Sequence, residues 1–170
     1  KYIILNTDTA IQYLDSGLDS AKIEWIMSNQ LIIANSYNLH SSVYEEMKNT
    51  GRLYSLGSDS LLQKIDRYYR RLEREEYYGR QRNNWALDSW NDCKYGLTVF
   101  LMDYASKGIS SIADHPWLFD QRSKHFLDLR IALRGSRGAM KGNRNRLKEM
   151  ISDSKELKSL LMTELETKGQ

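Results

Sequence analysis

The chain has 170 residues, of which 41% are hydrophobic and 28% are charged, and it contains one proline and one cysteine. This composition excludes a disordered chain, and the scarcity of proline disfavours an all-β fold, which needs frequent turn residues. The net charge of +3 is too small to demand an anionic partner. No stretch of about eighteen consecutive apolar residues exists that would cross a bilayer. The length favours one domain, residues 1–170.

Core positions that alternate in steps of three and four predict a first long helix over residues 4–37. Its weak point is Gly17, since glycine inside a helix costs about 1 kcal/mol relative to alanine. A break near residues 15–20 is the alternative. Because the apolar spacing keeps its phase across Gly17, one continuous helix is favoured.

A short helix is predicted next, over residues 42–50. Ser42 and Glu45 have the spacing of a capping box, in which each side chain satisfies a free backbone N–H at the helix start. Gly51 stands where a helix end takes a left-handed residue. We therefore expect a structural corner, with Gly51 at positive φ and with Tyr44 and Met47 buried against the long helices.

Two more long helices are predicted over residues 59–106 and 120–167, with Asp120 as the cap of the second. Together the segments predict an all-α fold, an elongated antiparallel bundle of three long helices and one short helix with coiled-coil-like spacing. Antiparallel pairing would place Asn83 level with Asn143, and Glu76 near Lys148. We interpret this polar level as one that fixes the pairing of the helices; a small ligand site is the alternative.

A basic stripe follows one face of the last helix, because its cations recur at spacings of four and three. Its members are Arg130, Arg134, Arg137, Lys141, Arg144 and Lys148. They could bind an anionic group, either nucleic acid or lipid. Ion pairs with the preceding helix are favoured instead, because antiparallel pairing brings two sets of carboxylates near the stripe. The expected partners are Asp88 and Asp92 for Arg134 and Arg130, and Glu73, Glu75 and Glu76 for Lys148; at least half of the six cations should pair with carboxylates of residues 73–92.

No catalytic, metal or cofactor site is predicted. The three histidines do not form a zinc-like set, and the pair of Glu-x-x-His segments that a bundle di-iron site uses is missing. His125 and Asp128 could share a helix face, but a structural or surface role is favoured. Cys93 lies in the core spacing between Trp90 and Leu97, where a thiol acts as a small buried apolar group. The strongest candidate for an acid catalyst is Glu76, if it were buried without a cation.

Two neighbouring segments resemble a known family. They are residues 41–53, Ser-Ser-Val-Tyr-Glu-Glu-Met-Lys-Asn-Thr-Gly-Arg-Leu, and residues 61–69, Leu-Leu-Gln-Lys-Ile-Asp-Arg-Tyr-Tyr. They are similar to an uncharacterised family of Bacteroidota proteins with a Tyr-Glu-Glu-Leu-Lys-x-Ser-Gly-like segment and then an Ile-x-x-Tyr-Tyr-like stretch. This chain has Met47 for the leucine and Thr50 for the serine, and outside these segments only the helical pattern matches.

Members of that family carry one N-terminal membrane-spanning helix before a helical domain. The resemblance therefore implies an anchor upstream of Lys1 and an extracytoplasmic, periplasmic location. It implies no enzyme activity. The expected function is a non-enzymatic interaction or sensing domain, acting on an unknown protein partner or by self-association. A cytosolic nucleic-acid-binding protein that uses the basic stripe is the alternative, and the implied location disfavours it.

Overall fold

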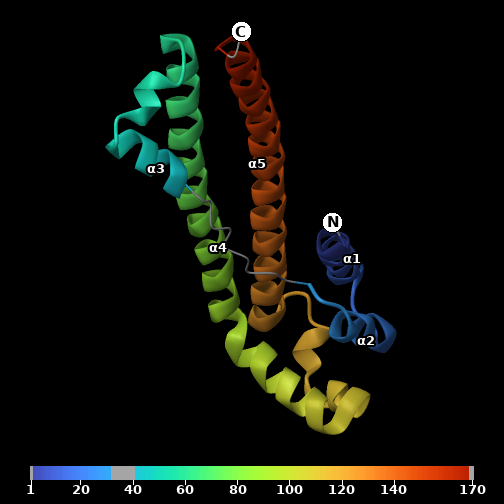
Figure 1. The fold of residues 1–170 in the computed structure, drawn as a ribbon. Helices are drawn as coiled ribbons and strands as arrows, with labels where there is room; N and C mark the ends of the chain where they lie inside the picture. The colour runs from blue at the N-terminus through green and yellow to red at the C-terminus, as the bar shows by residue number, and fades with distance from the viewer. Residues whose placement is uncertain (1, 32–40, 169–170) are drawn as a thin grey trace. The chain divides into compact units, whose positions relative to one another are not determined.

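The computed structural model describes residues 2–31 and 41–168, and these residues are almost wholly helical, with no strand among them (Figure 1). Within the described residues, five α-helices and three short 3₁₀ helices follow one another. The α-helices are α1 (Tyr2–Ser16), α2 (Ser20–Ser28), α3 (Ser42–Asn49), α4 (Asp59–Lys107) and α5 (Lys124–Lys168). The 3₁₀ helices are η1 (Arg52–Ser55), η2 (Gly108–Asp114) and η3 (Pro116–Leu118). The all-α prediction is confirmed.

The fold divides into two compact units. Unit 1 comprises Lys1–Asn35 and Gln81–Gly142, and unit 2 comprises Ser36–Arg80 and Asn143–Gln170. Both α4 and α5 contribute residues to each unit. This division shows that each unit is compact, but it does not test whether the two units fold as one domain. The single domain over residues 1–170 therefore stays a prediction.

Unit 1 has two apolar clusters. One joins α1 to α4 and α5 through Leu14, Cys93 and Phe126, each at most 2% exposed. The other surrounds Phe100 and includes residues of α2 and of the 3₁₀ helices; its buried members are Ile23, Phe100, Ile112 and Leu118. These positions recur at helical spacing, as the sequence predicts, because each helix buries one apolar stripe.

Unit 2 has a smaller core, in which α3 and η1 pack on α4 and α5. Its buried side chains are Tyr44, Leu53, Leu61, Ile65 and Leu157. Met47 is only partly buried against this cluster. The predicted burial of Tyr44 is therefore confirmed, whereas Met47 lies at the edge of the core.

The prediction of one helix over residues 4–37 is wrong. Gly17 has φ of +86°, a left-handed conformation that ends α1. Asp19 then caps α2, because its carboxylate accepts a hydrogen bond from the Lys22 N–H at 2.9 Å. Residues 32–37 of the predicted helix lie outside the described residues. The apolar spacing kept its phase because the three residues between α1 and α2 add nearly one helical turn.

The α1–α2 pair is tied by side-chain hydrogen bonds to backbone carbonyls beyond α2. Thr7, which is fully buried, donates to the Leu31 carbonyl at 2.5 Å. Asn6 donates to the Gln30 carbonyl at 3.3 Å. Such bonds satisfy carbonyls of the segment that follows α2, which have no partner within a helix.

The predicted corner after α3 is present. Gly51 has φ of +72°, as expected, and α3 spans Ser42–Asn49. The capping box is wrong, however, because Ser42 is already helical and Ser41 occupies the cap position without a side-chain hydrogen bond. The Glu45 N–H instead bonds to the Ser41 carbonyl at 2.9 Å.

The two long predicted helices are confirmed in position, with one difference at the start of α5. The helix begins at Lys124, and Ser123 caps it by accepting a hydrogen bond from the Phe126 N–H at 3.2 Å. Asp120, the predicted cap, accepts from the Arg122 N–H in the preceding turn. Among the described residues, no helix combines the length and hydropathy of a membrane span.

Candidate binding cleft and the basic stripe

Four of the six stripe cations pair with carboxylates of α1, within unit 1. Asp15 accepts from Arg130 at 2.8 Å and from Arg134 at 3.0 Å. Asp8 contacts Arg137 and lies 3.2 Å from Lys141. Asp8 and Asp15 are seven residues apart and therefore share one face of α1.

The predicted partners of the stripe are therefore wrong. Arg130 and Arg134 reach Asp15 of α1, not Asp92 and Asp88 of α4. Arg144 is partly buried and Lys148 is exposed. Within residues 2–31 and 41–168, no ion pair joins Lys148 to Glu73, Glu75 or Glu76. Sequence reasoning missed α1 as the partner because it treated α1 as the start of one longer helix.

The pKa of Asp8 reflects two opposing influences. Burial raises it, but hydrogen bonds and charge from Arg137 and Lys141 lower it by more, so the pKa lies below its usual value of 3.8. Asp8 therefore remains ionised at neutral pH and holds its two cations on α1.

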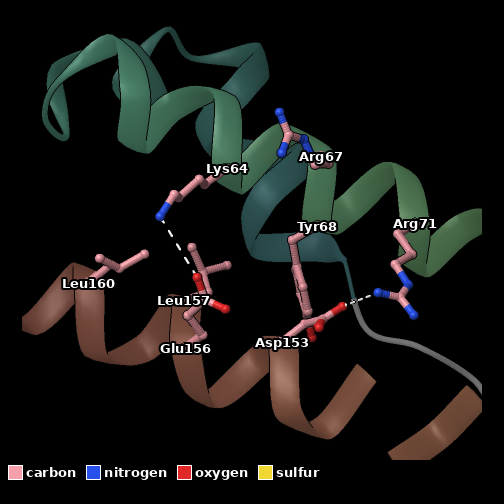
Figure 2. Close-up of a pocket in the computed structure, with 8 residues that line it drawn as sticks. All are labelled: Lys64, Arg67, Tyr68, Arg71, Asp153, Glu156, Leu157 and Leu160. Carbon is pink, nitrogen blue, oxygen red and sulfur yellow. Dashed lines mark hydrogen bonds and ion pairs between the residues drawn. The ribbon is translucent and has the colours of Figure 1, made fainter. Parts of the chain in front are cut away.

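A cleft lies between the N-terminal part of α4 and the C-terminal part of α5, both of which belong to unit 2. It encloses about 270 Å³. Its lining residues are Lys64, Arg67, Tyr68 and Arg71 from α4, and Asp153, Glu156, Leu157 and Leu160 from α5 (Figure 2). Cations thus line the α4 wall, carboxylates line the α5 wall, and Tyr68 reaches between the helices.

Two sets of ion pairs cross this cleft. Lys64 lies 3.8 Å from Glu156, which is a loose pair. Arg71 contacts Asp153 and lies 2.7 Å from Glu149. The Arg71 Nε–H is buried and has no hydrogen-bond partner.

Arg67 stands between these pairs along α4 and differs from its neighbours. It is exposed, and among the described residues no carboxylate forms an ion pair with it. Figure 2 shows its side chain leaving α4 on the side away from α5, so its guanidinium points out of the cleft. The two cations that reach toward α5, Lys64 and Arg71, are therefore both paired with its carboxylates.

The corner that carries the family resemblance is built around Tyr44. Its ring stacks on Tyr69 with centroids 4.0 Å apart, and its hydroxyl donates to Asp66 at 3.0 Å. Burial, followed by the hydrogen bond and charge of Asp66, raises the Tyr44 pKa to about 12. Lys48 lies over the same ring, 5.7 Å from its centroid. Glu45, the other residue of the predicted capping box, is exposed.

A buried histidine–carboxylate pair lies in unit 1 and was not expected. His115 Nε2 lies 2.9 Å from Asp103, and the histidine is 6% exposed. Its ring packs edge-on against Phe100 at 5.2 Å. The sequence placed His115 in a connector and gave no sign that η2 would fold it back onto α4. Its contacts are those of a structural residue that fixes this turn.

The other candidates for chemistry have ordinary surroundings. Burial raises the Cys93 pKa to about 11, so the thiol stays protonated. Glu76 is partly exposed, with Arg80 at 3.6 Å, so it is not the desolvated carboxyl that acid catalysis would need. Asp128 accepts from Lys124, while His125 packs against Trp117. In the described ranges, no three His, Cys, Asp or Glu side chains are grouped to hold a metal ion.

Comparison with known proteins gave no relative. No family model matches the chain. No curated protein and no solved structure is similar enough to match it either. The resemblance of residues 41–69 to the Bacteroidota family therefore stands on those residues alone.

Proposed function

We propose that this chain is a non-enzymatic helical domain that binds a partner or a small molecule outside the cytoplasm, held there by a membrane anchor upstream of Lys1. The periplasmic location and the anchor rest on the resemblance of residues 41–69. We also propose that the fold is an antiparallel helical bundle. Its long helices are α4 and α5, so it has two long helices where the sequence predicted three. An unknown protein and a second copy of the chain are both suitable partners.

The observation that carries the binding function is the unit 2 cleft, which has cations on its α4 wall and carboxylates on its α5 wall. Its carboxylates are placed for recognition, because Asp153 is 36% exposed and Glu156 is 71% exposed. Solvent reaches both carboxyl groups, whereas acid catalysts are usually desolvated. Binding through charge and shape is what such a surface supports.

Location is tested with the full-length protein, including its upstream residues. Alkaline phosphatase fused after Gln170 is active only outside the cytoplasm, and green fluorescent protein fused at the same position fluoresces in the cytoplasm. We expect phosphatase activity without fluorescence. Fluorescence without phosphatase activity would reject an extracytoplasmic location.

Nucleic-acid binding is the second candidate, and the stripe is the feature that favours it. Against it, four of the six cations are already neutralised by Asp8 and Asp15. Only Arg144 and Lys148 would then contact phosphate, so log K should fall by less than about 2 per decade of salt on duplex DNA. Fluorescence anisotropy across a salt series measures this slope. Tight binding with a slope near 5, reduced by about 1 in Arg144→Ala, would favour the nucleic-acid function instead.

A further inference from the structure

We propose that unit 1 contains a second binding site, an apolar pocket beside α2 that takes one aliphatic chain of about twelve carbons and leaves the polar end of the ligand in solvent. This inference goes beyond the proposed function, which rests on the unit 2 cleft. The pocket encloses about 320 Å³. Its lining residues come from α2, α4, α5, η3 and the segments on either side of α2, and all of them belong to unit 1.

The pocket has a buried floor and an open rim. Its least exposed lining residues are Ile23 of α2, Phe100 of α4 and Leu118 of η3, each 2% exposed, and they form the floor. Met27 of α2 is partly buried and lines the wall. Leu101 of α4 is 40% exposed and lies at the rim. Several elements therefore enclose this space, which distinguishes it from the apolar face of a single helix.

The lining is hydrocarbon almost throughout. Of the thirteen described residues that line the pocket, eleven are apolar and none carries a charge. Asn29 already uses its side-chain amide within the protein, because it donates to the Trp25 carbonyl at 2.8 Å and accepts from Asn6 at 3.4 Å. The other polar residue, Gln30, is also bonded within the protein. A charged group in this pocket would lose water without gaining a partner, so the buried part of the ligand is hydrocarbon.

The residue types and the volume define that hydrocarbon. Nine of the eleven apolar lining residues are Leu, Ile or Met, and only Trp90 and Phe100 present aromatic rings. Such a lining offers little ring stacking and suits a flexible aliphatic chain. A cavity of about 150 Å³ with a similar lining holds one benzene, so about 320 Å³ holds roughly twice as many carbons, about twelve.

A series of alkyl maltosides tests the size of the site. The octyl, decyl, dodecyl and tetradecyl compounds share one neutral head, which excludes an effect of charge, and each is used below its critical micelle concentration. A buried methylene tightens binding about fourfold, so the Kd should fall about tenfold for every two carbons up to dodecyl. From dodecyl to tetradecyl it should fall by less than about threefold, because the added carbons pass the rim into solvent. Isothermal titration calorimetry measures each Kd.

Two leucines of equal exposure locate the site. Leu101→Glu places a carboxylate at the rim and should weaken dodecyl maltoside binding by about tenfold or more. Leu127→Glu is the control, since Leu127 is also 40% exposed and belongs to unit 1 but does not line the pocket. Far-UV circular dichroism checks that both variants remain folded.

Tryptophan fluorescence gives a second, independent location. Trp90 lines the pocket, and its indole N–H is held by Ser136 at 2.6 Å. A bound chain should therefore change the emission of Trp90. Trp90→Phe should remove most of this response, whereas Trp85→Phe should keep it, because Trp85 is 59% exposed and lies outside the pocket.

Absence of binding by every maltoside would overturn the proposal, because the protein's own side chains would then close the pocket in solution. Affinity that rises by the same factor through tetradecyl would also overturn it, since general adsorption of detergent has no length limit. Equal effects of Leu101→Glu and Leu127→Glu, with a fluorescence response that survives in Trp90→Phe, would place the chain elsewhere. None of these outcomes bears on the location experiment or on the unit 2 cleft.

Discussion

At the scale of single residues, Gly51 and Gly138 form a matched pair for testing backbone conformation. Neither glycine has an atom within 4 Å of the position that a Cβ would occupy, so alanine meets no clash at either site. Gly51 has φ of +72°, whereas Gly138 lies inside α5. Differences between the two alanine variants therefore report backbone conformation alone.

Gly51→Ala should lower the free energy of unfolding by about 1 kcal/mol or more, because alanine is strained in the left-handed region. Gly138→Ala should raise it by about 1 kcal/mol, because alanine loses less backbone entropy in a helix. Chemical denaturation of the two variants measures both values. Two changes of the same sign would contradict the conformations assigned to these glycines.

The hydroxyl of Tyr44 gives a second residue-scale prediction. Its pKa is raised from 10.0 to about 12, mainly by burial and then by Asp66. Because the folded state holds this proton more tightly than the unfolded state, the resulting stability is complete below pH 10 and is lost as pH rises through about 12. Tyr44→Phe should remove the late-titrating step from the ultraviolet absorbance of tyrosinate.

The same variant should also cost about 0.5–1.5 kcal/mol near neutral pH, because Asp66 loses a hydrogen bond while the ring stack on Tyr69 remains. Tyr54→Phe is the control, since Tyr54 is 68% exposed. A normal titration of Tyr44 near pH 10 would show that the hydroxyl is solvated in solution.

At the scale of elements, the sequence predicted helices well where one apolar face ran without interruption. The positions of α4 and α5 follow from spacing, because a long amphipathic stripe leaves little choice of structure. The short helix α3 was predicted from a capping box and from Gly51, and of these two signals only the glycine is confirmed. The break after Ser16 was missed, because three non-helical residues preserve the phase of the stripe and Gly17 alone is a weak signal. The His115–Asp103 pair was missed because a 3₁₀ connector has no comparable periodicity.

The ion pairs of the basic stripe show the same limit. The spacing correctly predicted a face of cations that pairs with carboxylates. The predicted partner was α4, because α4 and α5 were aligned as an antiparallel pair. The observed partner is the acidic face of α1, which the assumption of one continuous N-terminal helix concealed. From charge patterns, it is easier to predict that cations form ion pairs than to predict which helix supplies the carboxylates.

Asp8→Asn tests whether these pairs hold α1 on α5. The variant leaves Arg137 and Lys141 without their carboxylate, so we expect a loss of about 1 kcal/mol and faster hydrogen exchange across α1. The effect should shrink at high salt. Asp88→Asn is the control, because Asp88 was the partner predicted from sequence and is exposed in the structure.

The pH dependence of Asp8 has the opposite sign to that of Tyr44. Its folded-state pKa lies below 3.8, so its contribution is complete above that value and is lost as pH falls below it. Exchange measured across this range should show α1 loosening in the wild-type protein but not in Asp8→Asn. Equal behaviour of the two proteins would mean that the pairs do not fasten α1.

At the scale of the whole molecule, the two compact units share their long helices, so we expect them to unfold as one domain. Each unit has its own apolar core, yet α4 and α5 supply residues to both. Extending a helix is favourable once its nucleus exists, so unfolding one unit removes the support of helices that the other also uses. This continuity favours a single cooperative transition, as the sequence predicted from length.

Cys93 provides the measurement for unit 1. It is 2% exposed, and burial raises its pKa to about 11, so a thiol reagent should modify it only after unit 1 opens. Unit 2 is followed through the near-UV circular dichroism of the stacked Tyr44 and Tyr69 rings, with Tyr44→Phe to identify that tyrosine signal. We expect the two probes and far-UV circular dichroism to share one midpoint in urea. Cys93 modification at a lower urea concentration than the loss of the tyrosine signal would instead show two domains. Each long helix would then unfold separately on the two sides of the unit boundary, which lies near residue 80 in α4 and near residue 143 in α5.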